Sequence, residues 1–286
     1  MNQKVQWRGK PRLGLINYIN CLPVLLPIVN GLVDLDAQVI LGQPSRLNSL
    51  FAACELEYGA MSAFAFLEQS NHLELIPTLS ISSQKAVSSV LLFCKESIAK
   101  YPPGRICVPV GSATSINVML LMLLQFNKNK PVLTTAEEPV LKDNNSDAAL
   151  VIGDRALVVD EEWSKEYYRY DLGQWWCESF NLPMVFGVFA VRNDYLLAND
   201  SGLGEPSSIE KLGAGLANAA DLGLNDYFAS VLYEAASRTG LSKDRLEQYY
   251  KKDLDFSWST KHQQAIDKYE LLCRQNGMFE DKKVLA

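Results

Sequence analysis

Short apolar segments alternate with helix-like segments over the first two thirds of the chain. Residues 37–41 form an apolar run typical of a buried strand, and Ser45 after it is a candidate helix N-cap. Leu47, Leu50 and Phe51 then share one face of the predicted helix. The same layout is predicted to begin at three more apolar runs, near 56–61, 105–110 and 148–152. This alternation predicts an α/β protein with a substantial parallel sheet.

Two longer apolar runs, at 88–94 and 184–192, bracket the middle of the chain. Both are typical of continuous buried strands, and their placement predicts two lobes joined by two crossing strands. We expect lobe I to comprise residues 1–93 and 190–286, and lobe II to comprise residues 94–189. The last third of the chain shows helix caps and one-sided apolar patterns, which indicate packing more than chemistry.

Charge and composition disfavour several classes of protein. The chain has 27 Lys and Arg against 33 Asp and Glu, a net charge of −6, and no basic patch, so nucleic acid is not an expected partner. The apolar helical run at 118–126 is much shorter than the roughly 20 residues that cross a bilayer. The N-terminal residues lack the apolar core of a signal peptide, so we expect a cytoplasmic protein that does not contact a membrane.

The residues that most often bind metals or act as bases are sparse. Six cysteines are scattered without a CxxC pair, so we predict neither a disulfide framework nor a metal site, and nothing in the sequence indicates a cofactor. The two histidines, His72 and His262, have polar neighbours, and we expect both to be solvent-exposed and without a role. A nucleophilic serine would need a histidine base or a GxSxG elbow, and this chemistry is therefore disfavoured.

Small polar residues concentrate where the predicted strands end, which is where ligands bind in open α/β sheets. The turn at 111–115, GSATS, opens a long apolar helix and carries three hydroxyls, more than helix capping alone requires. It lacks the lysine of a Walker A loop, which disfavours nucleotide phosphate. Free backbone N–H groups at helix starts bind carboxylates without a cationic cluster. The GSATS turn therefore serves either as an ordinary helix cap or as part of an anion site, and we expect such a site to be formed by Ser45, Ser62, Ser112, Thr114 and Ser115.

Three further places leave two interpretations open. Arg46 either pairs with a ligand carboxylate or covers the first turn of its helix in solvent. Gly153 and Asp154 end a predicted strand, and we expect both to face the substrate, although Asp154 alternatively caps the next segment. The segment NYINCLP at 17–23 carries two asparagines and a cysteine that serve either as turn residues or as ligand contacts.

Several segments occur together in an order that is similar to a known family. They are RLGLINYINCLP (12–23), PSRLNSLFAACELEYGAMS (44–62), LSISSQKAVSSVLLF (79–93), GSATS (111–115), DAALVIGDRAL (147–157) and YDLGQWWCESFNLPMVFGVFAVR (170–192). Together they resemble the chorismate dehydratase family of the futalosine route to menaquinone. Each motif is weak alone, whereas the ordered set is specific.

This resemblance implies a fold, a reaction and two site residues. The fold is a two-lobe, type II periplasmic-binding-protein-like arrangement, with a mixed sheet in each lobe and an active site in the cleft between them. The reaction removes water from chorismate, a small dicarboxylate, to give 3-[(1-carboxyvinyl)oxy]benzoate without a cofactor. The family places an Asn and a Ser against the substrate, and these correspond to Asn20 and Ser89. Of the two asparagines in this segment, Asn17 is the less favoured as a ligand contact.

Two segments depart from the family pattern, and in the first the usual Asp-Ile/Val-Gly-Pro is Glu57-Tyr58-Gly59-Ala60 in this chain. Where the family commonly has Gly-Pro-Val-Gly-Ser, this chain has Lys85-Ala86-Val87-Ser88-Ser89, so the backbone beside Ser89 lacks the freedom of glycine. A non-catalytic intracellular binder of a small carboxylate is the alternative function, because the fold is built to close on a ligand and catalytic groups are few. A later enzyme of the same route is disfavoured because it is expected to use a histidine base.

Overall fold

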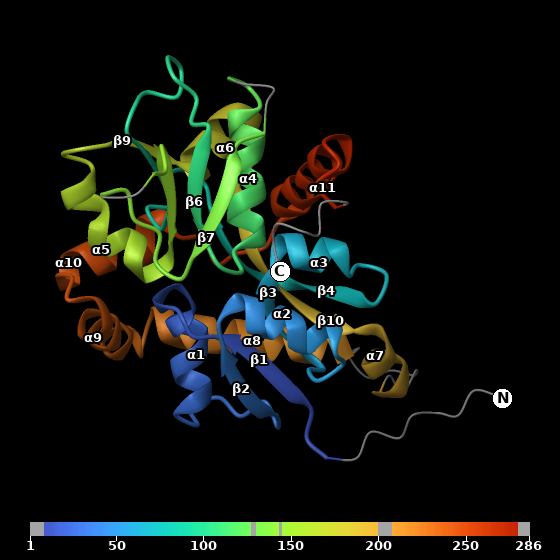
Figure 1. Cartoon of the computed structure of the whole chain (residues 1–286). Helices are drawn as coiled ribbons and strands as arrows, with labels where there is room; N and C mark the ends of the chain where they lie inside the picture. Colours follow the sequence, from blue (N-terminus) through green and yellow to red (C-terminus); the bar gives the residue numbers. More distant parts are fainter. Residues whose placement is uncertain (1–8, 127–129, 143–144, 200–207, 280–286) are drawn as a thin grey trace.

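Two five-stranded sheets organise the chain in the computed structural model, which describes residues 9–126, 130–142, 145–199 and 208–279 (Figure 1). The first sheet has the order β2-β1-β3-β10-β4, and β10 is antiparallel to both of its neighbours whereas β1 is parallel to both of its own. Its strands are β1 (Arg12–Ile16), β2 (Gln38–Gly42), β3 (Tyr58–Ser62), β4 (Leu73–Ser83) and β10 (Met184–Arg192).

The second sheet repeats this mixed pattern with the order β7-β6-β8-β5-β9. Here β6 is parallel to β7 and β8, while β5 is antiparallel to β8 and β9. Its strands are β5 (Val90–Cys94), β6 (Arg105–Pro109), β7 (Val132–Ala136), β8 (Ala148–Ile152) and β9 (Tyr168–Asp171). The predicted α/β class with a mixed sheet in each lobe is therefore confirmed.

Helices cover both sheets and also connect them. The first lobe carries η1 (Ile19–Cys21), α1 (Leu22–Val29), α2 (Pro44–Ala52), α3 (Ala63–Glu68), α7 (Asn193–Asn199), α8 (Ser208–Leu224) and α9 (Phe228–Thr239). The second carries α4 (Ala113–Leu123), α5 (Gly153–Trp163) and α6 (Leu172–Phe180). The chain ends with α10 (Lys243–Gln248), η2 (Tyr249–Asp253) and α11 (Thr260–Gln275). In Figure 1, α9 and α10 lie beside α5, and α11 contacts both α3 and α4, so the C-terminal helices bridge the lobes.

The two apolar runs predicted to cross between the lobes do not do so. β5 belongs wholly to the second sheet and β10 wholly to the first, so neither strand crosses between the lobes. By sheet membership, the chain crosses between β4 and β5 and again between α6 and β10. A continuous apolar run marks a strand that is buried on both faces, which does not make it a hinge. Residues 1–8, 200–207 and 280–286 of the predicted lobe I lie outside the described residues.

A close approach of two strands explains one glycine of the first sheet. At Gly59 of β3 the φ angle is +148°, and an added Cβ would lie 2.2 Å from the carbonyl oxygen of Gly14 in β1. Only glycine fits at this contact, because any side chain would separate the two strands. The close packing of β1 against β3 brings the ends of both strands to the border with the second lobe.

His262 is buried, which corrects the prediction that both histidines are exposed. Only 2% of its surface is accessible, and its Nδ1 lies 2.9 Å from the Ser259 hydroxyl at the start of α11. Its Nε2 lies 3.2 Å from the Ser82 hydroxyl and 3.2 Å from the Asp255 carboxylate. The imidazole therefore ties α11 to β4, because each polar neighbour satisfies a ring nitrogen that burial would otherwise leave unpaired. His72 is exposed, as predicted.

Candidate functional site between the lobes

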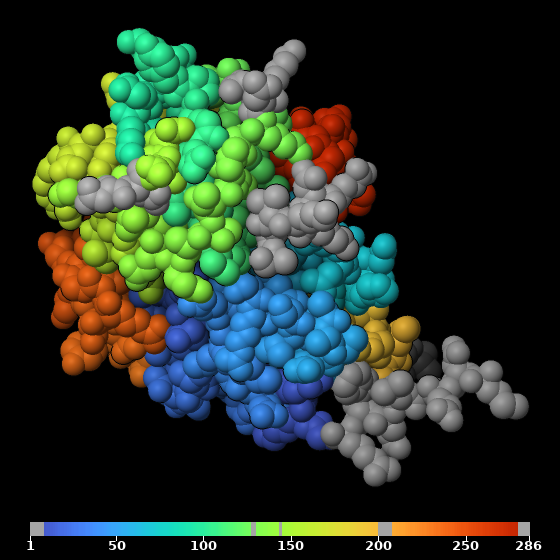
Figure 2. Space-filling view, viewed as in Figure 1, coloured from blue at the N-terminus to red at the C-terminus, as the bar shows by residue number. Residues whose placement is uncertain are grey.

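A cleft between the two lobes contains about 670 Å³ of space free of protein atoms, part of it open to solvent. The lobes on either side touch along their border in the view of Figure 2. Most of the cleft wall is apolar, and it includes Ile16, Ile81, Val87, Ile152 and Phe186. An apolar wall with a few placed polar groups is the usual composition of a site for a small organic ligand.

Seven of the ten residues predicted to face a ligand line this cleft. They are Asn20, Ser62, Ser89, Ser112, Thr114, Ser115 and Gly153. They come from strand ends and helix starts that lie more than a hundred residues apart in sequence, and the closure of the two lobes brings them together.

The other three predicted residues have different surroundings. Arg46 is directed to the Leu41 carbonyl oxygen at 3.4 Å on the exposed side of α2. Ser45 is not the N-cap of α2, because the helix already begins at Pro44, whose ring suits the first helical position. The Asp154 carboxylate accepts a hydrogen bond of 3.0 Å from the Ile19 backbone N–H in the other lobe, so its acceptor is used in joining the lobes.

Five α-helices begin at the cleft, and one of them, α3, has a side-chain cap, because the hydroxyl of its N-cap Ser62 accepts from the Ala65 backbone N–H. The other four are α1, α2, α4 and α5. Cys21 is the N-cap of α1, Pro44 is the first residue of α2, Ser112 is the N-cap of α4 and Gly153 is the first residue of α5. None of these four helices has a side-chain cap on its first backbone N–H groups. Among the described residues that line the cleft there is no Lys or Arg. The positive potential here therefore comes from helix starts, an arrangement that binds carboxylates. The start of α1 contributes least, because the Leu22 N–H bonds to the Ile19 carbonyl oxygen and Pro23 has no N–H.

Asn20 presents a polar atom without a partner. It lies in η1, directly after β1, and its Oδ1 is buried and has no hydrogen-bond donor within reach in the structure. A buried amide oxygen normally has a partner, and an unpaired one in a cleft indicates a place for a ligand. Asn17 differs, because its Oδ1 accepts a 2.8 Å hydrogen bond from Arg238 and its side chain does not line the cleft.

Ser89 is held from behind by a tyrosine that sequence reasoning missed. Tyr249 of η2 is fully buried and its hydroxyl donates a 2.9 Å hydrogen bond to the Ser89 Oγ. Burial raises the pKa of Tyr249, so the phenol stays protonated and remains the donor of this bond. The hydrogen of the Ser89 hydroxyl is then available to an acceptor in the cleft. No motif in the sequence marked Tyr249, because its pairing with Ser89 joins residues 160 positions apart.

The titratable residues of the cleft wall are protonated at neutral pH. Within the described part of the chain these are Tyr18 and Cys21. Burial raises the pKa of the Cys21 thiol to about 12, and burial likewise raises the pKa of Tyr18. No group of three or more His, Cys, Asp or Glu side chains suited to a metal ion is found in the described ranges. The wall thus offers hydrogen bonds and no strong base.

Two contacts hold the lobes against each other beside the cleft. The Phe64 backbone N–H of α3 donates a 3.0 Å hydrogen bond to the Thr114 Oγ1 of α4 in the second lobe. At Gly111, where φ is +73°, an added Cβ would lie 2.3 Å from the Cβ of Ser45. The structure therefore has the lobes closed, and Gly111 leaves the space that closure needs.

Comparisons with known proteins place this site in context. Residues 11–275 match the model of a family described as menaquinone biosynthesis. A chorismate dehydratase of Thermus thermophilus is 27% identical over 197 residues, which covers 64% of this chain and 70% of the relative. No membrane-spanning helix was found in a search of the described residues.

Solved structures agree with the fold. A protein of Archaeoglobus fulgidus has a TM-score of 0.74 at 18% identity, covering 94% of this chain and 98% of its own. The periplasmic aliphatic sulphonate-binding protein of Escherichia coli has a TM-score of 0.64 at 12% identity, covering 98% and 96%. These likenesses confirm the predicted two-lobe, periplasmic-binding-protein-like fold. Since the family model spans both lobes and the cleft between them, the chain belongs to the menaquinone biosynthesis family.

Proposed function

We propose that the chain is a chorismate dehydratase that removes water from chorismate to give 3-[(1-carboxyvinyl)oxy]benzoate, a step of the futalosine route to menaquinone. The observation that carries this proposal is the set of four uncapped helix starts around a cleft without lining cations. Chorismate carries two carboxylates and a carbocyclic ring, which match helix starts and an apolar wall respectively. Family membership and the Thermus relative support the same reaction.

The reaction breaks two bonds on neighbouring ring carbons. A proton leaves the carbon that bears the enolpyruvyl ether, and hydroxide leaves the adjacent carbon, which creates the third double bond of a benzene ring. The ring carboxylate acidifies that proton through the conjugated double bond, and aromatisation drives the elimination. Because the cleft wall provides no strong base, we assign the proton to the enolpyruvyl carboxylate of the substrate itself.

The protein then has two tasks, which are orientation and hydrogen bonding. We assign the Ser89 hydroxyl as a donor toward charge that develops on the substrate, because Tyr249 already donates to its oxygen. We assign the unpaired Asn20 Oδ1 as the acceptor for the substrate hydroxyl, while the amide nitrogen of the same group is a donor. Holding the ring between these two groups sets the geometry of the elimination.

A direct assay tests this function. The purified chain is incubated with chorismate at neutral pH, and the products are separated by chromatography and identified by mass and proton NMR. We expect an aromatic product lighter than chorismate by one water, formed faster than in a sample without protein. Tight binding of chorismate without turnover would support the alternative, a non-catalytic binder of a small carboxylate, and absence of both would contradict the assignment of chorismate as the ligand.

Closure of the lobes is expected to fail when Gly111 becomes alanine. The new Cβ would lie 2.3 Å from the Ser45 Cβ and 2.7 Å from its Oγ in the closed state. Overpacking of this kind costs about 1–3 kcal/mol, so kcat/KM for chorismate should fall roughly 5- to 160-fold. Steady-state kinetics measures the loss.

A second substitution distinguishes this clash from general damage. Removing the Ser45 side chain in the double variant G111A/S45G should restore the part of the lost kcat/KM that the clash causes, while the strain of alanine at a φ of +73° remains. Gly240→Ala is the matched control, since Gly240 has nearly the same φ of +72° and its added Cβ would meet nothing within 4 Å. A double variant as impaired as the single one would rule out the Ser45 contact as the cause.

A further inference from the structure

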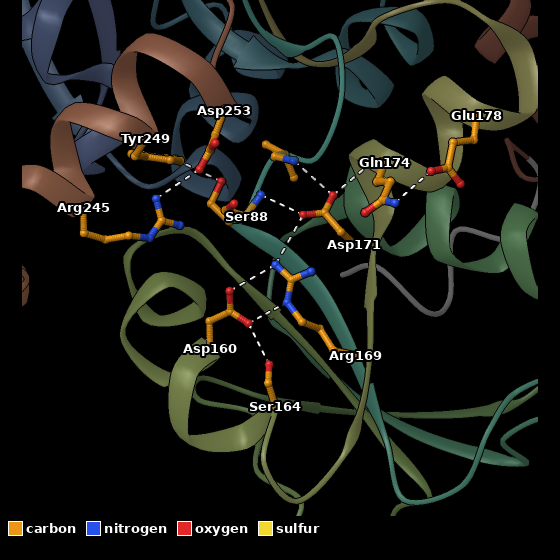
Figure 3. Close-up of polar contacts among 12 residues, drawn as sticks. Ser88, Asp160, Ser164, Arg169, Asp171, Gln174, Glu178, Arg245, Tyr249 and Asp253 are labelled. Carbon is orange, nitrogen blue, oxygen red and sulfur yellow. Dashed lines mark hydrogen bonds and ion pairs between the residues drawn. The ribbon is translucent and has the colours of Figure 1, made fainter.

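Asp171 is a buried carboxylate that does more than cap its own helix. It ends β9 and is the N-cap of α6, where its Oδ1 accepts a 3.0 Å hydrogen bond from the Gln174 backbone N–H. The same oxygen accepts from the Val87 backbone N–H at 3.0 Å, and Oδ2 accepts from the Ser88 backbone N–H at 2.8 Å. Figure 3 shows this carboxylate between α6 and the segment that leads to Ser88. A helix cap needs only the first of these three bonds.

Asp171 binds the segment in which the chain crosses from the first lobe to the second. Ser89, which lines the cleft, follows this segment directly. Ser88 is buried and has a φ of +60°, a left-handed conformation that is unfavourable for residues other than glycine. A conformation of this kind persists only where surrounding contacts impose it. The two bonds from Val87 and Ser88 to Asp171 are such contacts, and they stand immediately before Ser89 in the chain.

Further residues of α6 press on the same segment. An added Cβ at Gly173 would lie 2.5 Å from the Ser83 Oγ and 3.1 Å from the Lys85 carbonyl oxygen. The Cys177 thiol donates to the Ser83 carbonyl oxygen at 3.4 Å. The first two turns of α6 therefore form a platform for the crossing segment, and Asp171 provides the bonds nearest to Ser89.

The charge of Asp171 is compensated inside the protein. Arg169 Nη2 lies 3.6 Å from Oδ2, and the same guanidinium is oriented by hydrogen bonds of 2.6 and 3.0 Å to Asp160 (Figure 3). Burial raises the pKa of Asp171, while the three backbone N–H groups and Arg169 favour its charged form. An ionised carboxylate offers acceptors on both oxygens, which three donors from two segments require.

We propose that Asp171 is a positioning residue for the reaction, because it holds the Val87–Ser88 backbone in the conformation that points the Ser89 hydroxyl into the cleft. This inference rests on the proposed function, since Ser89 is assigned there as a donor to the substrate. Asp171 does not line the cleft, so its effect on turnover passes through Ser89.

The test uses a variant that keeps the N-cap bond of α6 and loses the hydrogen bonds to the Val87 and Ser88 backbone. In Asp171→Ser the hydroxyl remains a preferred N-cap for the Gln174 N–H, but a single short acceptor cannot also hold the Val87 and Ser88 N–H groups. We expect kcat for chorismate to fall roughly 10- to 100-fold, the loss that misplacement of a reacting group by about 1 Å produces. KM should change little. Glu178→Ala, on the exposed side of the same helix, is the control and should keep the wild-type kcat.

A double-mutant cycle separates positioning from general structure. If Asp171 acts through Ser89, D171S should reduce kcat little further in a chain that already carries S89A. If its effect is merely structural, the fold-losses in kcat of the two single variants should multiply in the double variant. If D171S does not fold, Asp171→Asn, which keeps the size and one acceptor oxygen, takes its place in the cycle. Fully multiplicative losses would overturn the proposal.

A crystal structure of D171S keeps this test independent of turnover. We expect Ser88 to leave its positive φ and the Ser89 Oγ to move away from Tyr249. Unchanged positions of both would overturn the role of Asp171, even in a chain that converts chorismate. Failure of the wild-type chain to convert chorismate would instead overturn the proposed function, and the structure of D171S would then decide whether Asp171 controls the conformation of the crossing segment.

Discussion

Replacing Asn20 with alanine is expected to lower kcat for chorismate roughly 100- to 1,000-fold, which is the usual cost of removing one hydrogen-bonding group that acts on the reacting atoms. The Asn20 Oδ1 is buried and unpaired in the cleft, so the substrate is the partner that would satisfy it. Alanine removes both the acceptor and the donor of the amide. Steady-state kinetics with product quantified by chromatography measures the change.

Asn17→Ala is the matched control for this prediction. Asn17 lies three residues earlier, is exposed and binds Arg238, so its loss should leave kcat within about threefold of the wild-type value. Equal losses in the two variants would show that disturbance of the turn, and not the loss of a substrate contact, explains the effect. Asn20→Asp adds a charge beside a dianionic substrate and should raise KM as well as lower kcat.

Removal of the Ser89 hydroxyl is the second change with a large expected effect. Ser89→Ala should lower kcat roughly 100- to 1,000-fold if this hydroxyl donates to developing charge. Tyr249→Phe should have a smaller effect, roughly tenfold, because Ser89 remains but loses the 2.9 Å bond that directs its hydrogen into the cleft. The two variants are compared by kcat and by thermal unfolding, since both side chains are buried.

The double variant tests whether Tyr249 acts only through its hydrogen bond to Ser89. In the double variant S89A/Y249F, we expect kcat close to that of S89A alone, because Tyr249 has no cleft contact of its own and acts through the serine. A much slower double variant would show that Tyr249 contributes separately. Turnover by S89A at the wild-type rate would remove Ser89 from the mechanism, while an intact Asn20 effect would leave the proposed reaction in place.

Local pattern was sufficient for most strands and helix starts. The run predicted at 184–192 is β10 residue for residue, and Ser62 caps α3 by accepting from the Ala65 N–H, as a serine after a strand is expected to do. The prediction that the runs at 88–94 and 184–192 cross between the lobes was wrong because strand pairing is not local. The apolar run that ends in β5 gives no sign of which sheet it will join, and the sheet is chosen by partners far along the chain.

In the candidate site, too, some residues were predicted from local pattern and others were placed only by the tertiary structure. Serines and threonines at strand ends predicted the hydroxyl groups of the cleft lining, because the ends of strands and the starts of helices meet there in any fold of this kind. Arg46 and Asp154 were not separated from them by sequence, since their type permits either ligand contact or local bonding. The structure separates them by direction, with Arg46 toward Leu41 and the Asp154 carboxylate toward Ile19.

Local pattern along the chain was enough for the α/β class and for the small polar residues at strand ends, because alternation, capping and turn preferences act over a few neighbouring residues. The two-lobe fold with its cleft, Asn20 and Ser89 followed from the resemblance carried by the ordered motifs. Tertiary structure alone decided that Tyr249 stands behind Ser89, that Asp171 grips the Val87–Ser88 backbone and that His262 is buried. Each of these contacts joins segments more than eighty residues apart. Such contacts depend on how the two lobes and the C-terminal helices pack together, and local sequence preferences carry no information about that packing.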